Sequence, residues 1–139
     1  MAIILLPPSE GKTPASTGPR LKLASLSFPE LTATREKVLA SLMSLSSGPQ
    51  KKALSTLGIS AKQISELENN QRLLTGHCGP AWQIYTGVLF GALDPQSLST
   101  AQRTKLSKST YVQSALFGLV GFDDKIPAYR LSEIGRAHV

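Results

Sequence analysis

Two apolar runs, one near each end of the chain, predict the strands of a core. Residues 2–6 are apolar without interruption and stop at Pro7 and Pro8, which cannot continue a hydrogen-bonded ladder. Residues 111–120 mix aromatic, branched and small side chains and form the second strong strand candidate. We expect the first run to be a buried strand that delivers a polar loop to its carboxyl end, where α/β proteins often hold ligands.

Between these runs the apolar positions recur at helical spacing. Residues 31–45 carry a stripe of leucines and one valine, which leaves Arg35, Glu36 and Lys37 on the face expected to meet solvent. Further helices are expected over residues 50–56, 61–74 and 100–108, whereas residues 81–88 fit either a strand or the front of a helix. The order strand, helices, strand predicts an α/β fold, with α+β as the alternative.

The joint between the two short middle helices is a glycine turn, residues 57–60. Gly58 permits the positive φ that a tight reversal requires. Ser60 is expected to cap the second helix through its hydroxyl, while Gln63 reaches back to the Ser60 amide as in a capping box. Amides left free at such a helix start can hold a phosphodiester oxygen when positive charge lies nearby.

These features make the joint a candidate helix-hairpin-helix that binds DNA. The residues expected to contact the phosphates are Lys51, Lys52, Gly58, Ile59, Ser60 and Lys62. The alternative is a plain corner of two helices with solvated lysines, because Ser60 stands where such a hairpin usually has its second glycine.

The charge of the chain also favours a polyanionic partner. Fifteen Lys and Arg against nine Asp and Glu give a formal net charge of +6 over 139 residues. This excess attracts nucleic acid without specifying a sequence. Aromatic residues are only 6% of the chain, and no basic run alternates with them as in a platform that stacks single-stranded bases. Contact with phosphates of duplex or branched DNA is therefore the expected mode.

The Gly11-Lys12-Thr13 sequence ends like a nucleotide-binding P-loop but fails its other requirements. The first glycine of that motif should stand where this chain has Leu6. The lysine should also open a helix, whereas residues 13–19 have the composition of a turn and loop. Two interpretations of Lys12 remain: a solvated lysine in a loop at the end of a strand, or part of another kind of anion-binding site.

The second function class considered is an enzyme or binding protein for a small anion. Polar groups at the ends of the two predicted strands could surround one pocket, and these are Ser9, Glu10, Lys12, Thr13, Tyr85, Tyr129 and Arg130. Their spacing defines no catalytic triad, zinc helix or carboxylate pair, so no reaction class follows. Substitution of Lys12 or Arg130 should separate this function from DNA binding, which should depend on the lysines of the hairpin instead.

The sequence predicts no bound metal and no cofactor. Cys78 is the single cysteine, and with His77 alone beside it the pair has too few partners for a zinc site. A buried, idle thiol is the expected state, the alternative being a thiolate activated by His77. No apolar run reaches the length of a membrane span and residues 1–6 lack the features of a secretory signal, so we expect a cytoplasmic protein without membrane contact.

The last seven residues are expected to be foreign to the protein. Residues 133–139 match one translated frame of a widely used sequencing adapter, whose next codon in that frame is a stop. Residues 1–132 are then the N-terminal portion of one larger domain. A half-domain would expose apolar faces of its strands, so we expect it to be unstable or prone to aggregation.

Four segments together resemble the peroxide stress protein YaaA family. They are residues 5–13 (LLPPSEGKT), residues 28–31 (FPEL), residues 84–90 (IYTGVLF), and residues 114–120 (SALFGLV) leading into residues 126–132 (IPAYRLS). The resemblance implies a cytosolic protein that helps cells survive hydrogen peroxide, by limiting reactive free iron and protecting DNA. It also implies that a helix-hairpin-helix for duplex and branched DNA falls on residues 57–60, and that family members are close to twice this length.

Overall fold

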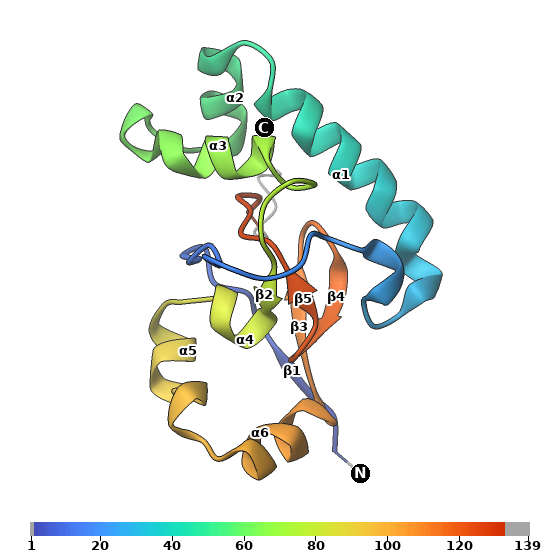
Figure 1. The fold of residues 1–139 in the computed structure, drawn as a ribbon. Helices are drawn as coiled ribbons and strands as arrows, with labels where there is room; N and C mark the ends of the chain where they lie inside the picture. The colour runs from blue at the N-terminus through green and yellow to red at the C-terminus, as the bar shows by residue number, and fades with distance from the viewer. Residues whose placement is uncertain (1, 133–139) are drawn as a thin grey trace.

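The computed structural model describes residues 2–132, in which two small sheets lie between two groups of helices (Figure 1). In this part of the chain the larger sheet has the order β1 (Ile4–Leu6), β3 (Thr110–Ser114), β4 (Gly118–Gly121). Strand β1 runs parallel to β3, and β3 runs antiparallel to β4. The smaller sheet pairs β2 (Gly79–Pro80) with β5 (Lys125–Ile126). This mixture of helices with parallel and antiparallel strands confirms the predicted α/β class.

The second predicted strand is a hairpin rather than one strand. Ser114 of β3 pairs with Gly118 of β4, so the chain reverses within residues 115–117. The reversal needs Gly118, whose φ of 79° is in the region that favours glycine. Phe117 donates its amide hydrogen to Ser114 Oγ at 3.0 Å, which closes the turn. The turn was not predicted because the sequence stays apolar through residues 115–117 and gives no sign of a reversal.

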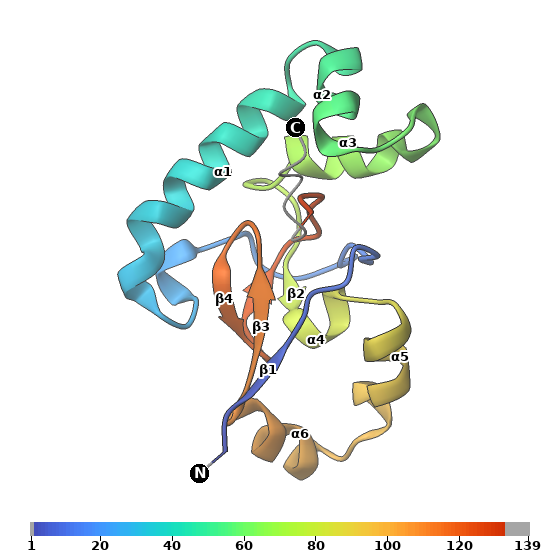
Figure 2. The same cartoon turned by 180° about the vertical axis from the view of Figure 1, so that it is seen from behind.

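Helices cover both ends of the sheets (Figures 1 and 2). One group contains α1 (Thr32–Ser46), α2 (Gln50–Leu57), the 3₁₀ helix η3 (Ala61–Gln63) and α3 (Ile64–Gln71). The other contains α4 (Ala81–Ile84), α5 (Val88–Leu93) and α6 (Thr100–Ser107), and further 3₁₀ turns are η1 (Leu23–Ser25), η2 (Pro29–Leu31) and η4 (Pro95–Ser97). The predicted helices are thus present, residues 81–84 form a helix, and the helix expected to reach residue 74 ends at Gln71.

Arg35 of α1 does not face solvent as its position in the sequence predicts. Its side chain is buried, and its Nε donates to Phe117 O at 2.8 Å. Its Nη1 donates to Phe28 O at 3.1 Å, and its Nη2 donates to Ser27 O at 2.7 Å and to Leu119 O at 2.8 Å. The guanidinium therefore joins α1 and the segment before it to the hairpin of β3 and β4, whose carbonyls would otherwise lack these donors.

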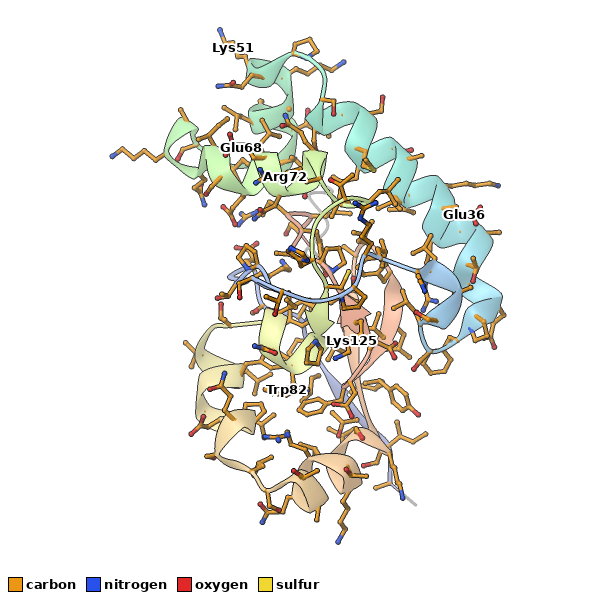
Figure 3. The ribbon with its side chains drawn as sticks, viewed as in Figure 1. Glu36, Lys51, Glu68, Arg72, Trp82 and Lys125 are labelled. Atoms are coloured by element: carbon orange, nitrogen blue, oxygen red, sulfur yellow. The ribbon has the colours of Figure 1, made fainter. Side chains whose placement is uncertain are left out.

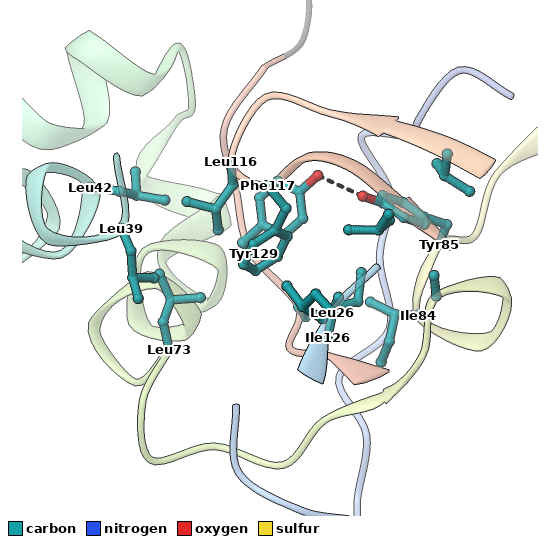
Figure 4. Packing of buried hydrophobic residues seen from close by; sticks show 14 of the residues in the cluster. Leu26, Leu39, Leu42, Leu73, Ile84, Tyr85, Leu116, Phe117, Ile126 and Tyr129 are labelled. Carbon is teal, nitrogen blue, oxygen red and sulfur yellow. Dashed lines mark hydrogen bonds between the residues drawn. The ribbon is translucent and has the colours of Figure 1, made fainter. Parts of the chain in front are cut away.

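A continuous apolar core joins the helices to the strands (Figure 4). Leu39 and Leu42 of α1 belong to the same cluster as Phe117 of the hairpin and Ile126 of β5. Tyr129 also belongs to it, and its ring meets the ring of Phe117 edge to face at a centroid distance of 5.6 Å. The segment that follows β5 is therefore held by packing, which fixes the position of Arg130 beside it.

Strand β1 is an exposed edge rather than the buried strand that its apolar run predicts. The exposed fractions are 68% for Ile3, 42% for Ile4 and 54% for Leu5. Within residues 2–132, β1 pairs with β3 on one side and with no strand on the other (Figure 2). An apolar strand is expected to be buried by other parts of the protein, but among the described residues these side chains of β1 remain exposed.

Candidate anion-binding pocket

The loop after β1 and the segment after β5 meet around a cavity of about 190 Å³. The residues that line it are Pro7, Pro8, Ser9, Glu10, Lys12, Arg130, Leu131 and Ser132. Backbone bonds hold the loop in place, because Thr13 donates its amide hydrogen to Ile84 O at 2.8 Å and Thr86 donates to Gly11 O at 3.0 Å. The loop thus gains a rigid support from the end of α4 and the residues that follow it.

Lys12 enters this pocket beside two tyrosine rings. Its Nζ lies 4.3 Å from the ring centroid of Tyr129 and 5.7 Å from that of Tyr85, and it donates to Glu10 O at 3.2 Å. The pKa of the Lys12 ammonium is lowered to about 8. Burial is the main cause, and the positive charge of Arg130 is the second. The carboxylates of Glu66 and Glu10 act in the opposite direction. About a tenth of the Lys12 amine is therefore uncharged at pH 7, far more than for an exposed lysine.

Arg130 is fixed from both its backbone and its side chain. Asn70 of α3, which is fully buried, accepts the Arg130 amide hydrogen at 2.7 Å and donates to Arg130 O at 2.9 Å. The guanidinium lies 3.3 Å from Glu66 Oε1 and 3.7 Å from Glu10 Oε2. Its Nε is buried and has no hydrogen-bond partner among the residues that the structure describes. One donor of this cation, on a residue that lines the cavity, thus lacks an acceptor among the described residues.

A chain of hydroxyl groups holds the two tyrosines against each other. The Tyr85 hydroxyl is 2.7 Å from the Tyr129 hydroxyl (Figure 4). The Tyr129 hydroxyl is in turn 2.8 Å from Ser114 Oγ. Both tyrosines are buried. Because Ser114 Oγ already accepts the Phe117 amide hydrogen, the whole chain is anchored to the turn of the hairpin. The aromatic surface under Lys12 is therefore rigid.

The structure brings together most of the pocket residues chosen from the sequence. Ser9, Glu10, Lys12 and Arg130 line the cavity, with Tyr85 and Tyr129 in contact with Lys12 from below. Thr13 is adjacent, but it is not among the lining residues. The sequence reasoning missed Glu66, Asn70, Ser114 and Ser132. Glu66 and Asn70 stand four residues apart and so share a helix face, the one signal that could have paired them.

The hairpin joint has only part of the predicted geometry. Gly58 has the expected positive φ of 71°, and Gln63 Oε1 accepts the Ser60 amide hydrogen at 3.0 Å as predicted. Gly58 donates to Ser55 O, and the buried Ile59 donates to Leu54 O at 3.0 Å. The amides of residues 58–60 are therefore used within the turn, while the expectation of free amides at the start of the following helix stays a prediction.

The lysines of the joint do face solvent. Lys51, Lys52 and Lys62 are all exposed, and Figure 3 shows Lys51 extending away from the molecule at the end of α2. This surface lies far along the helical group from α6, at the opposite end of the molecule (Figure 1). The joint and the Lys12 pocket use different lysines, but Glu66 connects them: it accepts a hydrogen bond from Gln63 at 2.9 Å and lies 3.3 Å from the Arg130 guanidinium.

Cys78 and His77 do not form a reactive pair in this structure. Cys78 is 1% exposed, and burial raises the pKa of its thiol to about 11. His77 Nδ1 lies 2.9 Å from Gly18 O, a backbone partner on another segment. In residues 2–132 no three His, Cys, Asp or Glu residues are grouped so as to hold a metal ion. No helix in that range combines the length and hydropathy needed to cross a bilayer.

Fold and pocket together define a mixed α/β protein in which a lysine after the first strand and an arginine after the last converge on one cavity. The family model described as "Peroxide stress protein YaaA" matches residues 1–137. The chain belongs to this family.

Curated relatives agree with this assignment. A UPF0246 protein of Streptomyces coelicolor is 47% identical over 130 residues, which are 94% of this chain and 50% of that protein. A UPF0246 protein of Corynebacterium efficiens is 46% identical over the same shares of both chains. The chain therefore spans about half the length of these relatives.

Proposed function

We propose that this chain acts in the peroxide stress response of the cytoplasm by binding a small anionic ligand between Lys12 and Arg130. The observation that carries the proposal is the convergence of these two cations on one cavity. The Arg130 Nε adds to it, because this atom is buried and has no hydrogen-bond partner among the described residues. Two carboxylates, Glu10 and Glu66, keep the guanidinium in place but leave that donor unused. An anionic group of matching size would complete its hydrogen bonding.

Loss of the Lys12 ammonium or of the Arg130 guanidinium is expected to weaken anion binding at least tenfold. Each charge-assisted hydrogen bond contributes about 1.5–3 kcal/mol, which corresponds to about one order of magnitude or more in affinity. Isothermal titration with inorganic phosphate and with glyoxylate would compare the unmodified chain with Lys12→Ala and Arg130→Lys. Lys37→Ala, on the exposed face of α1, is the matched control and should leave the affinity unchanged. Equal binding by all four proteins would refute the pocket.

A second candidate function is binding of duplex or branched DNA through the hairpin joint, which would protect DNA and help limit iron- and peroxide-driven damage. The observation that favours it is the exposure of Lys51, Lys52 and Lys62 around the turn at Gly58. The net charge of +6 acts in the same direction. Because the amides of residues 58–60 bond within the turn, contact would depend on the lysine side chains.

DNA binding of this kind is expected to fall steeply with salt concentration. Each phosphate contact contributes about 0.9 to the slope of log affinity against log salt for a duplex. Lys51→Glu with Lys62→Glu should therefore lower that slope by about 2 in gel-shift or anisotropy titrations with duplex and four-way probes. Lys105→Glu with Lys108→Glu changes the net charge equally at the exposed surface of α6 and its C-cap. If both pairs have the same effect, the joint is not the DNA site.

A further inference from the structure

The search for an additional activity leads to the chemistry of the Lys12 amine. This amine borders the cavity, and its backbone is held by a bridge to Tyr85. Other nucleophiles nearby are occupied: Ser9 Oγ donates its hydrogen to Gly11 O at 2.6 Å, and the Tyr129 hydroxyl lies within the buried chain of hydroxyl groups. Lys12 is therefore the group best placed to attack a molecule bound in the cavity.

We propose that Lys12 condenses with an α-oxo acid, a molecule with a carbonyl group next to a carboxylate, to form an imine. The inference rests on the proposed function, because Arg130 and its unused Nε would hold the carboxylate while the neighbouring carbonyl meets the amine. A cavity of about 190 Å³ has room for such a small molecule. Arg130 would thus select the carboxylate of the ligand, and Lys12 would select its carbonyl group.

The step requires no oxidant, reductant or metal. The lone pair of the neutral amine attacks the carbonyl carbon, and a carbon–nitrogen bond forms as the carbonyl π bond breaks. Both hydrogens of the nitrogen then leave with the former carbonyl oxygen as water, and a carbon–nitrogen double bond remains. The atoms balance as one amine plus one carbonyl compound giving one imine plus one water.

The surroundings of Lys12 support its nucleophilic form. Arg130, from the segment after β5, disfavours a second positive charge, whereas Glu66 of α3 and Glu10 of the same loop favour it. The aromatic faces of Tyr85 and Tyr129 complete the enclosure. The lowering of the pKa by burial is larger than the raising of the pKa by the two carboxylates. The pKa therefore falls from its ordinary value of 10.5 to about 8. Desolvation beside another cation is a recognised way to activate a lysine.

The test is reductive trapping of the full chain with glyoxylate and cyanoborohydride near pH 8, followed by peptide mass spectrometry. We expect a carboxymethyl group on Lys12 to appear about tenfold faster than on the exposed Lys51 or Lys52. Labelling of Lys12 should saturate with glyoxylate concentration. Acetaldehyde, which lacks the carboxylate, should label Lys12 without saturation. Lys12→Arg keeps a cation in the pocket and should abolish the rapid label, while Arg130→Lys should raise the glyoxylate concentration needed for half-maximal rate.

The outcomes separate the two proposals. Glyoxylate binding in the calorimeter with Lys12 labelled no faster than Lys51 would overturn the imine and leave the anion site standing. Rapid labelling of Lys12 that is equally unsaturated with both aldehydes, together with no calorimetric binding, would overturn the α-oxo acid as ligand and the anion site with it. Saturable, Arg130-dependent labelling of Lys12 supports both.

Discussion

Replacement of Arg35 by alanine is expected to lower the free energy of unfolding by about 3–5 kcal/mol. The guanidinium donates four hydrogen bonds to backbone carbonyls of Ser27, Phe28, Phe117 and Leu119. Alanine leaves these acceptors without their donor and also leaves a cavity where a buried arginine stood. Because a small domain has only about 5–15 kcal/mol of stability, this loss is a large share of the total.

Urea unfolding followed by the fluorescence of Trp82, the single tryptophan of the chain, measures this effect. Arg20→Ala is the matched control, because Arg20 is exposed and its loss should change stability by no more than about 0.5 kcal/mol. Arg35→Lys should fall between the two, since one ammonium group cannot reach all four carbonyls in the plane that a guanidinium spans. An unchanged urea midpoint in Arg35→Ala would show that α1 does not depend on this residue.

Replacement of Lys12 by methionine is expected to stabilise the protein by about 2 kcal/mol near pH 7. A pKa of about 8 in place of 10.5 means that burial opposes the charged form by about 3 kcal/mol. Contact of the ammonium with the rings of Tyr129 and Tyr85 returns about 1 kcal/mol. Methionine has a similar length and no charge, so the penalty disappears while the packing remains.

The pH dependence of this difference identifies its cause. Below pH 8, Lys12 is protonated in both the folded and the unfolded chain, and the burial penalty is present in full. Between pH 8 and 10.5 the unfolded chain keeps the proton that the folded chain releases, so the unmodified protein gains stability as pH rises. The advantage of Lys12→Met over the unmodified protein should therefore shrink across that window.

Urea unfolding of both proteins over this pH range provides the measurement, with Lys62→Met on the exposed surface as the control. A destabilising effect of Lys12→Met that is the same at every pH would mean that the ammonium is favoured in its pocket. The expected gain would have a functional meaning, because residues kept at the expense of stability are typical of binding and catalytic sites.

Local patterns predicted the helices well and the long-range placement of charges poorly. The stripe over residues 31–45 corresponds to α1, and the helix expected over residues 100–108 is α6, which a capping box of Ser99 and Gln102 begins. Both depend on neighbours within one helical turn. The burial of Arg35 depends on a hairpin that lies more than eighty residues away in the sequence, and helical periodicity contains no information about it.

The pocket was partly predictable, because the position of polar residues after predicted strands can be read locally, whereas their long-range contacts cannot. Polar groups that follow predicted strands were expected to meet, and Lys12 and Arg130 do line one cavity. The clamp of Asn70 on the Arg130 backbone could not be inferred, because it requires α3 to pack against the segment after β5. The exposure of β1 was missed because composition alone cannot tell a covered strand from an uncovered one.

The pairing of β1 with β3 also fixes the order of events during synthesis. Ile4 lies opposite Thr110, so β1 has no partner in this sheet until more than a hundred further residues have been translated. Lys12 likewise acquires its aromatic enclosure only when Tyr129 emerges. The apolar residues 2–6 are therefore unpaired for most of the synthesis of this chain, which makes them a site of possible aggregation until β3 forms.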